Sequence, residues 1–307
     1  VELPIFHWRE GTSSRSAARN ESLVRSVPPG SILGRLRLTE QGELINEKYG
    51  LRPIALRVFE QSFSALSLAA ANVAPPEQVA PRWHDAMELM ARTASESYRS
   101  LIRSEGFDEF FRSITPIDVI ERMQIGSRPT ARDDRVGVAG LRAVLWLSAW
   151  AQCRYMIPGW FGAGAALRAV EMELGEATLS ELYNRWFFFE NLIDDVELAL
   201  ARADLDIAAC YDALTQGKHA DIITAIREEY ALAQRHVQKL KGCARLLDGE
   251  PTLQRSIRLR NPYLDPMHMM QADLLQRWRA GGRDDNELLN ALLASVGGIA
   301  SGLQGSA

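Results

Sequence analysis

The feature that most constrains the fold is a helical period that runs through most of this chain. Between residues 83 and 104, apolar side chains recur every three or four positions, at Met87, Met90, Ala94 and Tyr98. This spacing places them on one face of a helix, where such a stripe packs against a core. The pattern therefore predicts a mainly helical protein, and it indicates that this stripe is core.

Other segments extend the same pattern. Helices are predicted over residues 55–71, 83–104, 118–123, 182–200, 220–240, 266–279 and 286–303. Short strands are predicted over residues 1–8, 33–38 and 124–129. The dense apolar run 142–154 fits either a central strand or a buried helix, and periodicity does not decide between them. A few strands followed by many helices are expected for part of an α/β barrel with elaborated later helices.

Composition excludes several classes of protein. The chain has 307 residues, 47% of them hydrophobic, which is enough for one large domain or two small ones. A net charge of -4 argues against a nucleic-acid-binding protein. No apolar run reaches about 18 residues, so neither a membrane span nor a signal peptide is expected. The three cysteines are far apart and form no CxxC, which favours a reducing, cytoplasmic setting. Because the first residue is Val, we expect further sequence upstream.

Arginines in predicted loops are the first candidates for chemistry. Arg9 and Arg15 lie in a loop after a predicted strand, Arg128 follows another strand, and Arg142 begins the apolar run. Guanidinium forks match carboxylates and phosphates, and α/β-barrel sites lie at the C-terminal ends of strands. Spacing alone leaves open whether these residues form an anion site or are ordinary surface arginines.

Histidines give weaker signals. His7 follows a predicted strand and is more typical of a satisfied core residue than of a base. His84, His219 and His236 are predicted on solvated helical surface, and His268 among methionines is predicted to be buried. No HxxxH or HExxH pair occurs, so a histidine-built metal site is not supported. The glycine-rich run 159–167 lacks a phosphate-binding context and favours close helix packing.

Several segments, taken in order, resemble the phosphoenolpyruvate carboxylase family. Residues 34–43 (GRLRLTEQGE) resemble its RVTEQGE strand, and residues 126–129 read GSRP as its loop does. Residues 141–162 are similar to LRAIPW.FAWTQ.R..LP.WLG, and residues 260–275 (RNPYLDPMHMMQADLL) to LRN.YTDPLN.LQAELL. Residues 298–302 (GIASG) resemble GIAAG. Order and spacing agree over essentially the whole chain.

The resemblance implies a fold and a reaction. The fold is mainly α: the later half of a β/α (TIM-type) barrel over residues 1–157, then a large helical region over 158–307. The family's N-terminal part is absent here. Family members join bicarbonate to phosphoenolpyruvate with Mg or Mn, giving oxaloacetate and phosphate, and the catalytic His and metal ligands are expected upstream. A homo-oligomer is implied, and a missing N-terminal portion or a partner chain is expected to close the half-barrel.

The resemblance also assigns arginines to roles, with no metal ligand in this chain. Substrate binding of a small anion falls on Arg9, Arg128 and Arg142, which should converge on one pocket. The catalytic set, on the glycine-loop motifs, is Arg9 and Arg15. The acidic-effector set is Arg15, Arg202 and Arg260.

Two stretches depart from the family pattern. Where the family reads FHGRGG…GRGGGP, this chain reads FHWREGTSSRSAAR, so Trp8 and Glu10 replace glycines. A glycine loop lets backbone N–H groups close on a phosphate, and these side chains crowd that approach. The family's terminal NTG is replaced by Gly305, Ser306 and Ala307.

Three functional hypotheses follow. The sequence favours an altered enzyme, a carbon–carbon lyase or hydrolase that acts on a small phosphorylated or dicarboxylate substrate. The second hypothesis is an ordinary phosphoenolpyruvate carboxylase seen as a fragment, and the third is a non-catalytic regulatory or pseudoenzyme subunit. Because Trp8 and Glu10 alter the phosphate loop, the first hypothesis predicts little or no bicarbonate-dependent oxaloacetate formation.

Overall fold

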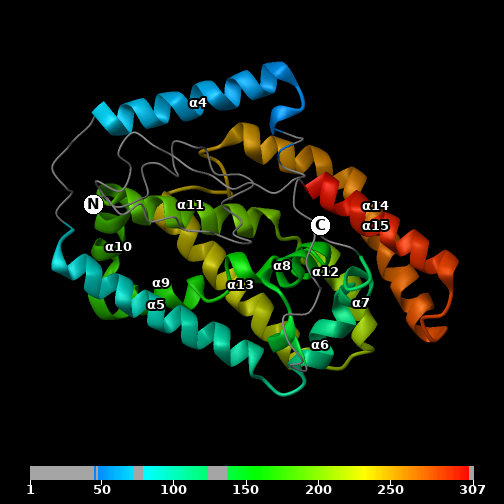
Figure 1. Ribbon diagram of the computed structural model, residues 1–307. Helices are drawn as coiled ribbons and strands as arrows, with labels where there is room; N and C mark the ends of the chain where they lie inside the picture. Colours follow the sequence, from blue (N-terminus) through cyan, green and yellow to red (C-terminus); the bar gives the residue numbers. More distant parts are fainter. Residues whose placement is uncertain (1–44, 46–47, 72–78, 124–136, 304–307) are drawn as a thin grey trace, which may run out of the picture.

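The structure, a computed structural model, describes residues 45, 48–71, 79–123 and 137–303, and every regular element within them is helical (Figure 1). The first α-helices of the described residues are α4 (Arg52–Ala71), α5 (Pro81–Ile102), α6 (Phe107–Ile114), α7 (Ile117–Ile120), α8 (Ala143–Gln152) and α9 (Ala163–Leu174). Those that follow are α10 (Glu176–Arg185), α11 (Phe187–Arg202), α12 (Leu205–Asp212), α13 (Ala220–Lys241), α14 (Pro251–Ala280) and α15 (Asn286–Leu303). Three 3₁₀ turns occur at Val138–Gly140, Ile157–Gly159 and Ala213–Thr215.

Most predicted helices are confirmed. α15 has the predicted bounds, and α4, α5 and α13 differ from their predictions by a few residues at either end. The apolar run 142–154 forms the buried helix α8, which resolves the choice between strand and helix. The three predicted strands lie outside the described residues, so the barrel half is an expectation that these helices do not test.

Two predictions were wrong in their bounds. Residues 182–200 are not one helix, because the chain turns extended at Trp186 (φ -126°, ψ 100°) between α10 and α11. The Trp186 ring stacks on Trp83 with centroids 6.0 Å apart, and this tertiary contact is invisible to local periodicity. α14 begins at Pro251 instead of residue 266, since Pro262 and Pro266 lie within the helix instead of starting it.

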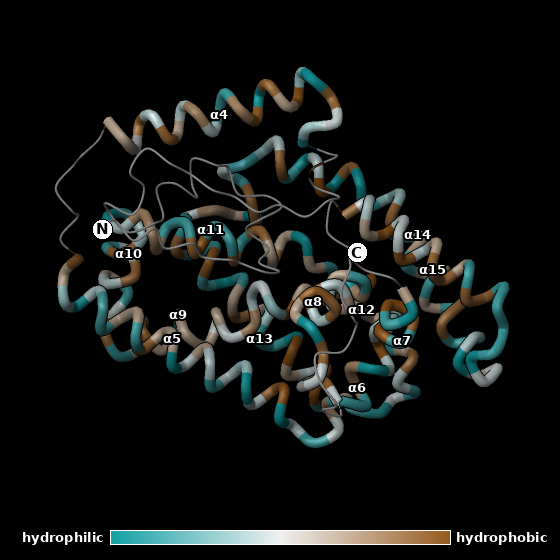
Figure 2. Tube along the Cα trace, in the orientation of Figure 1, coloured by the Kyte–Doolittle hydropathy of each residue, from teal (hydrophilic) through white to brown (hydrophobic). Residues whose placement is uncertain are grey.

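The core lies where α5, α9 and α13 pack side by side and where α8 crosses the middle of the molecule. α8 is almost wholly apolar, as the brown tube in Figure 2 shows. Small residues bring α9 against α13: a Cβ added at Gly164 would lie 2.6 Å from the backbone nitrogen of Ala233. This confirms that the glycine-rich run 159–167 serves close helix packing.

The helices α14 and α15 form a hairpin along one side of the molecule (Figure 1). The C-terminal turn of α14 is fixed by Arg279, whose Nε and Nη2 donate to the two Asp118 carboxylate oxygens at 3.0 and 2.8 Å. The same guanidinium donates to the carbonyls of Ser113 and Thr115. This one side chain therefore ties α14 to the turn between α6 and α7.

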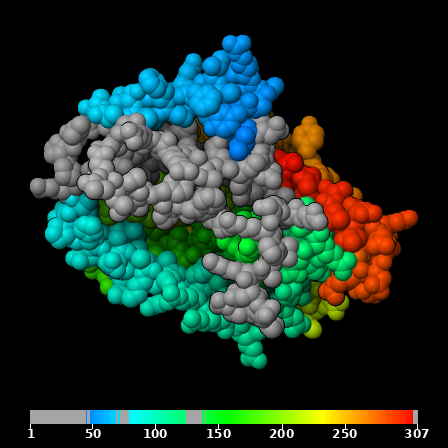
Figure 3. Space-filling view, viewed as in Figure 1, coloured from blue at the N-terminus to red at the C-terminus, as the bar shows by residue number. Residues whose placement is uncertain are grey.

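The helix α4 lies at the periphery, along the upper edge in Figures 1 and 3, and other described elements pack only sparsely against it. Its apolar side chains are largely exposed: Ile54, Leu56, Phe59, Phe63 and Leu68. An exposed apolar stripe of this length is typical of a surface that another polypeptide segment covers. Among the described helices, none combines the length and hydrophobicity that a bilayer crossing requires.

Candidate functional site

Arg142 stands immediately before α8 and belongs to the predicted substrate set. Its backbone is extended (φ -74°, ψ 150°), and its carbonyl accepts the first helical hydrogen bond from the Trp146 N–H at 3.0 Å. The Arg142 Nε is buried and has no hydrogen-bond partner among the described residues. A guanidinium beside the N-terminus of a buried helix combines its own charge with the positive end of the helix dipole. The arrangement suits an anion.

Arg202 and Arg260, assigned by resemblance to an effector site, do come together. Arg202 is the last residue of α11 and Arg260 lies inside α14. Burial, and then the nearby charge of Arg260, lower the pKa of Arg202 to about 10. The side chain therefore remains protonated at neutral pH, and two positive charges lie near each other in a partly buried place.

Hydrogen bonds fix where the Arg260 guanidinium lies. Its Nε donates to the Ser256 carbonyl in the preceding turn, and its Nη1 donates to the Gly302 carbonyl at 3.2 Å. The second bond connects α14 with the last turn of α15.

A third arginine, Arg154, lies beside this pair, and sequence reasoning gave it no role. It follows the C-cap of α8 in the left-handed region (φ 61°), and its side chain is 1% exposed. Its Nη2 donates to Asn261 Oδ1 at 3.3 Å and lies 3.5 Å from Asp204 Oδ2. The only signal available in the sequence was its place in the motif that begins near Arg142.

The remaining predicted site residues cannot be placed. Arg9, Arg15 and Arg128 lie outside the described residues, as does His7, so the predicted convergence of Arg9, Arg128 and Arg142 stays a prediction. Arg202 and Arg260 lie near Arg154, which follows the C-terminal end of α8, whereas Arg142 precedes the N-terminal end of that helix. At 1.5 Å per residue, that helix separates its two ends by about 15 Å.

Two of the histidine predictions were wrong. His219 and His236 were predicted to be solvated, yet their side chains are only 13% and 14% exposed. His219 adopts φ 60° before α13 and packs edge-on against Phe110, while His236 Nδ1 lies 3.1 Å from Glu171. His84 is exposed and His268 is buried, as predicted.

His268 belongs to a chain of polar side chains that runs through the core. Its Nδ1 lies 3.0 Å from the Tyr211 hydroxyl, which donates to Gln271 Oε1 at 2.8 Å. Gln271 Nε2 donates to Gln152 Oε1 and to Ser295 Oγ, each at 3.0 Å. These bonds connect α8, α12, α14 and α15, which indicates a structural role, although the buried His268 Nε2 has no hydrogen-bond partner among the described residues.

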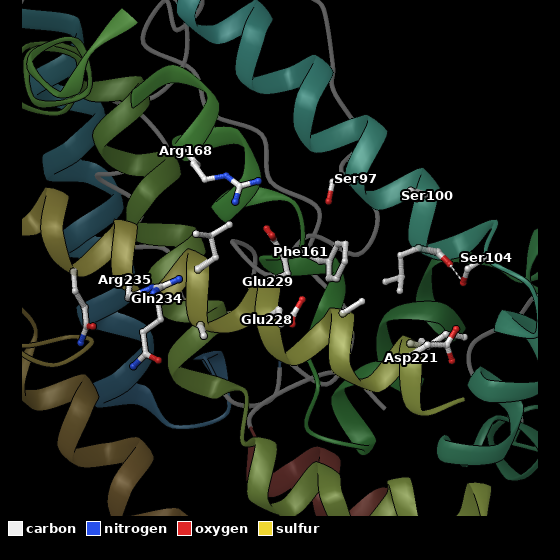
Figure 4. A pocket seen from close by; sticks show the side chains of 16 residues that line it. Ser97, Ser100, Ser104, Phe161, Arg168, Asp221, Glu228, Glu229, Gln234 and Arg235 are labelled. Carbon is white, nitrogen blue, oxygen red and sulfur yellow. Dashed lines mark hydrogen bonds between the residues drawn. The ribbon is translucent and has the colours of Figure 1, made fainter. Parts of the chain in front are cut away.

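A polar groove opens elsewhere, between α5 and α13, with a volume of about 870 Å³. In Figure 4, Ser97, Ser100 and Ser104 lie along α5, and side chains of α13 lie opposite them. Glu229, at its floor, already accepts hydrogen bonds from the Gly162 and Ala165 N–H groups at the start of α9. The groove is open to solvent, and its buried carboxylate is already hydrogen-bonded to the backbone of α9. Arg142 and the Arg202–Arg260 pair are therefore the better candidate sites.

A divalent metal finds no suitable site among these helices. Within the residues that the structure describes, no three His, Cys, Asp or Glu side chains gather where they could hold one ion. Mg and Mn prefer several oxygen ligands, mainly carboxylates and water. No chemical step is therefore assigned to a metal within this part of the chain.

Comparison with known proteins gives consistent matches. The family profile described as phosphoenolpyruvate carboxylase matches residues 1–306. A phosphoenolpyruvate carboxylase of Xanthomonas campestris pv. campestris (strain 8004) is 43% identical over 305 residues, which cover 99% of this chain and 34% of the relative. Proteins of the same name from Roseiflexus castenholzii and Alcanivorax borkumensis are 39% and 36% identical, over the same shares of both chains. The chain thus spans about a third of the length of the curated relatives it matches.

Proposed function

The chain belongs to the phosphoenolpyruvate carboxylase family, and we propose that it works as the C-terminal third of a phosphoenolpyruvate carboxylase. The activity is the joining of bicarbonate to phosphoenolpyruvate, which gives oxaloacetate and phosphate. One observation carries the proposal: similarity to relatives of that name is continuous over 99% of the chain. It favours the ordinary carboxylase over the altered enzyme that the sequence alone suggested.

In this proposal Arg142 holds the anionic substrate, together with Arg9 and Arg128. Phosphoenolpyruvate carries a carboxylate and a phosphate, both of which suit guanidinium forks. The Nε of Arg142 just before α8 is buried and has no hydrogen-bond partner among the described residues, which supports the assignment. Positive charge in a site that excludes water also stabilises an enolate as it forms.

Arg202 and Arg260 bind an acidic effector in this proposal, with Arg15. A dicarboxylate or acidic amino acid carries negative charges that suit two neighbouring guanidiniums. The depressed pKa of Arg202, caused by burial and by the charge of Arg260, supports a place that gains from a bound anion.

The divalent Mg or Mn that the family uses would polarise the phosphate and carboxylate oxygens of the substrate when bound. Its ligands, and the catalytic histidine, are proposed to lie in the part of the relatives that this chain does not span. That same part, or a partner chain, is proposed to cover the exposed face of α4. Assembly into a homo-oligomer is proposed on the same basis.

A second candidate remains because of Trp8 and Glu10. If these residues crowd the phosphate loop, the protein binds phosphoenolpyruvate and releases phosphate without forming oxaloacetate. The arginines would then serve a hydrolase or another lyase. The same pocket supports both candidates, and the fate of bicarbonate distinguishes them.

The test uses the complete open reading frame that contains this sequence, assayed with malate dehydrogenase as the coupling enzyme. With the wild-type protein, malate dehydrogenase should oxidise NADH only when phosphoenolpyruvate and bicarbonate are both present. Arg142→Gln should lower kcat/KM by about 100-fold or more, because it removes a charge-assisted contact to the substrate. Arg99→Gln, an exposed arginine of α5, is the matched control and should change little. Equal activity of wild type and Arg142→Gln would remove Arg142 from the substrate site.

A further inference from the structure

The position of Arg142 depends on the short turn that leads into it. A 3₁₀ turn over Val138–Gly140 precedes it, closed by hydrogen bonds from the N–H groups of Gly140 and Leu141, each at 3.2 Å. Among the described residues, no hydrogen bond fixes the buried Nε of Arg142. The backbone of this turn therefore decides where the guanidinium points.

An acidic side chain from an earlier helix holds the start of this turn. Asp108 lies in the first turn of α6, and its Oδ1 accepts a hydrogen bond from the Val138 N–H at 3.2 Å. The first N–H groups of a helical turn have no partner within the turn, so a carboxylate that accepts from one of them stabilises it. Asp108 supplies this cap from 30 residues away in the sequence.

The residue at the start of the turn, Gly137, fits the same carboxylate. Its backbone (φ 84°, ψ -164°) lies in a region that is essentially restricted to glycine. A Cβ added at Gly137 would lie 2.6 Å from Asp108 Oδ2, so the carboxylate packs directly against this residue. The hydrogen bond and the close packing are separate observations, and both place Asp108 at the beginning of the turn.

The helix that carries Asp108 is firmly packed. The apolar side chains of its buried face are each at most 2% exposed: Phe107, Phe110, Phe111 and Ile114. The Phe111 ring lies against Trp146 of α8 with centroids 4.9 Å apart, and the Trp146 N–H donates to the Arg142 carbonyl. The helix α6 therefore contacts the backbone on both sides of Arg142, the turn before it through Asp108 and the helix after it through Phe111.

We propose that Asp108 is a positioning residue for substrate binding, which holds the turn at Val138 so that Arg142 meets the anionic substrate. The inference rests on the proposed role of Arg142. The negative charge of Asp108 is unsuited to contact with an anion, so its contribution comes through the backbone that carries the arginine. A small displacement of a substrate-binding group weakens its contact strongly. Loss of the cap should therefore be felt at the substrate.

The experiment uses the complete protein and two measurements. Phosphate release from phosphoenolpyruvate, with bicarbonate and a divalent metal, gives kcat and KM, and calorimetry without bicarbonate gives the Kd for phosphoenolpyruvate. Asp108→Ala removes the acceptor and should raise both KM and Kd by about 10-fold, while kcat falls by less than about 3-fold. Asp108→Asn keeps an acceptor oxygen and should stay within about 3-fold of wild type in all three.

Glu109→Ala is the matched control. Glu109 is the other acid in the first turn of α6, but it pairs with Lys218 and His219 on the side of α13. The two alanine variants lose the same charge from the same turn, and their urea midpoints should agree. KM and Kd of Glu109→Ala should remain within about 2-fold of wild type, because the turn before Arg142 keeps its cap.

A double-mutant cycle shows whether the effect passes through Arg142. Asp108→Ala should lower kcat/KM by about 10-fold in the wild-type background but by less than about 2-fold in the Arg142→Gln background. The reason is that the guanidinium it positions is then already gone. A residue that only stabilised the fold would lower kcat/KM equally in both backgrounds.

The contrary outcomes point to different claims. The positioning role is overturned if Asp108→Ala keeps the wild-type KM, if Asp108→Asn is as impaired as the alanine variant, or if the losses in the two backgrounds are equal. The role of Arg142 is then unaffected, because Arg142→Gln alone tests it. Failure of wild type to bind phosphoenolpyruvate would overturn the proposed function, and this inference with it.

Discussion

At the scale of single residues, a few buried polar side chains contribute to a mainly apolar core. Tyr211, His268 and Gln271 are fully buried between α12 and α14 and are joined by hydrogen bonds. Replacing one member leaves a partner unpaired in a dry place, which typically costs about 1–3 kcal/mol. The histidine adds a dependence on pH.

Burial, and then the charge of Arg154, lower the pKa of His268 from 6.5 to about 3. The folded protein therefore keeps this ring neutral, while the unfolded chain takes up a proton below about pH 6.5. Stability from this group is complete above pH 6.5 and falls as the pH drops toward 3, by at most about 1.4 kcal/mol per pH unit. His268→Gln should be less stable than wild type at pH 7.5, and the difference should shrink by pH 5.

Urea midpoints at pH 7.5, 6 and 5 measure this effect. His84→Gln, an exposed histidine on α5, serves as the control and should follow the wild-type profile. A constant difference between His268→Gln and wild type at all three pH values would show that His268 does not titrate as described.

At the scale of elements, local patterns predicted helices well and their ends less well. The bounds of α15 follow from its own amphipathic pattern, which is bracketed by polar residues. The break at Trp186 depends on stacking against Trp83, a residue more than 100 positions away, so no local window contains it. The early start of α14 was missed because prolines were treated as helix starts, whereas Pro262 and Pro266 are tolerated inside it.

The contact between α9 and α13 should be sensitive to a single methyl group. A Cβ at Gly164 would meet backbone atoms of Ala233, so Gly164→Ala should destabilise the protein by roughly 1–3 kcal/mol. Gly297→Ala is the matched control: this glycine also lies inside a helix, but a Cβ there meets nothing within 4 Å. The control should be neutral or stabilised by up to about 1 kcal/mol. Chemical denaturation of both variants decides, and equal effects would refute the packing account.

The clamp at the end of α14 gives a second element-level prediction. Arg279→Met removes the bonds to Asp118 and to two backbone carbonyls, and it should cost roughly 2–4 kcal/mol. Arg277→Met, two residues earlier, removes only an exposed ion pair with Asp273 and should cost less than about 1 kcal/mol. Thermal unfolding compares the two, and a similar loss in both would mean that the clamp contributes little.

At the scale of the whole molecule, the site is the part that sequence reasoning placed least completely. The resemblance brought Arg202 and Arg260 to one function, and the structure places them within reach of each other's charge. The sequence analysis gave Arg154 and Asn261 no role, because their hydrogen bond joins segments more than 100 residues apart. Half of the predicted site arginines, Arg9, Arg15 and Arg128, lie outside the described residues.

The exposed face of α4 predicts a specific partner, the portion of the relatives that this chain does not span. The 307-residue chain alone should bind a hydrophobic dye, and adding that portion should reduce the dye signal. Phe59→Gln combined with Phe63→Gln should weaken the association, because both side chains are mostly exposed on α4. Glu60→Gln is the matched polar control. Analytical ultracentrifugation measures the association. If the double variant associates as tightly as wild type, the interface lies elsewhere.

The central claim is that this chain serves carboxylation, and the fate of labelled bicarbonate tests it most directly. The complete protein is incubated with phosphoenolpyruvate, a divalent metal and ¹⁴C-bicarbonate, and oxaloacetate is trapped as malate. The account predicts that label enters acid-stable product in a one-to-one ratio with phosphate released. Phosphate release without label in the product would contradict the account and establish the hydrolytic candidate that Trp8 and Glu10 suggest.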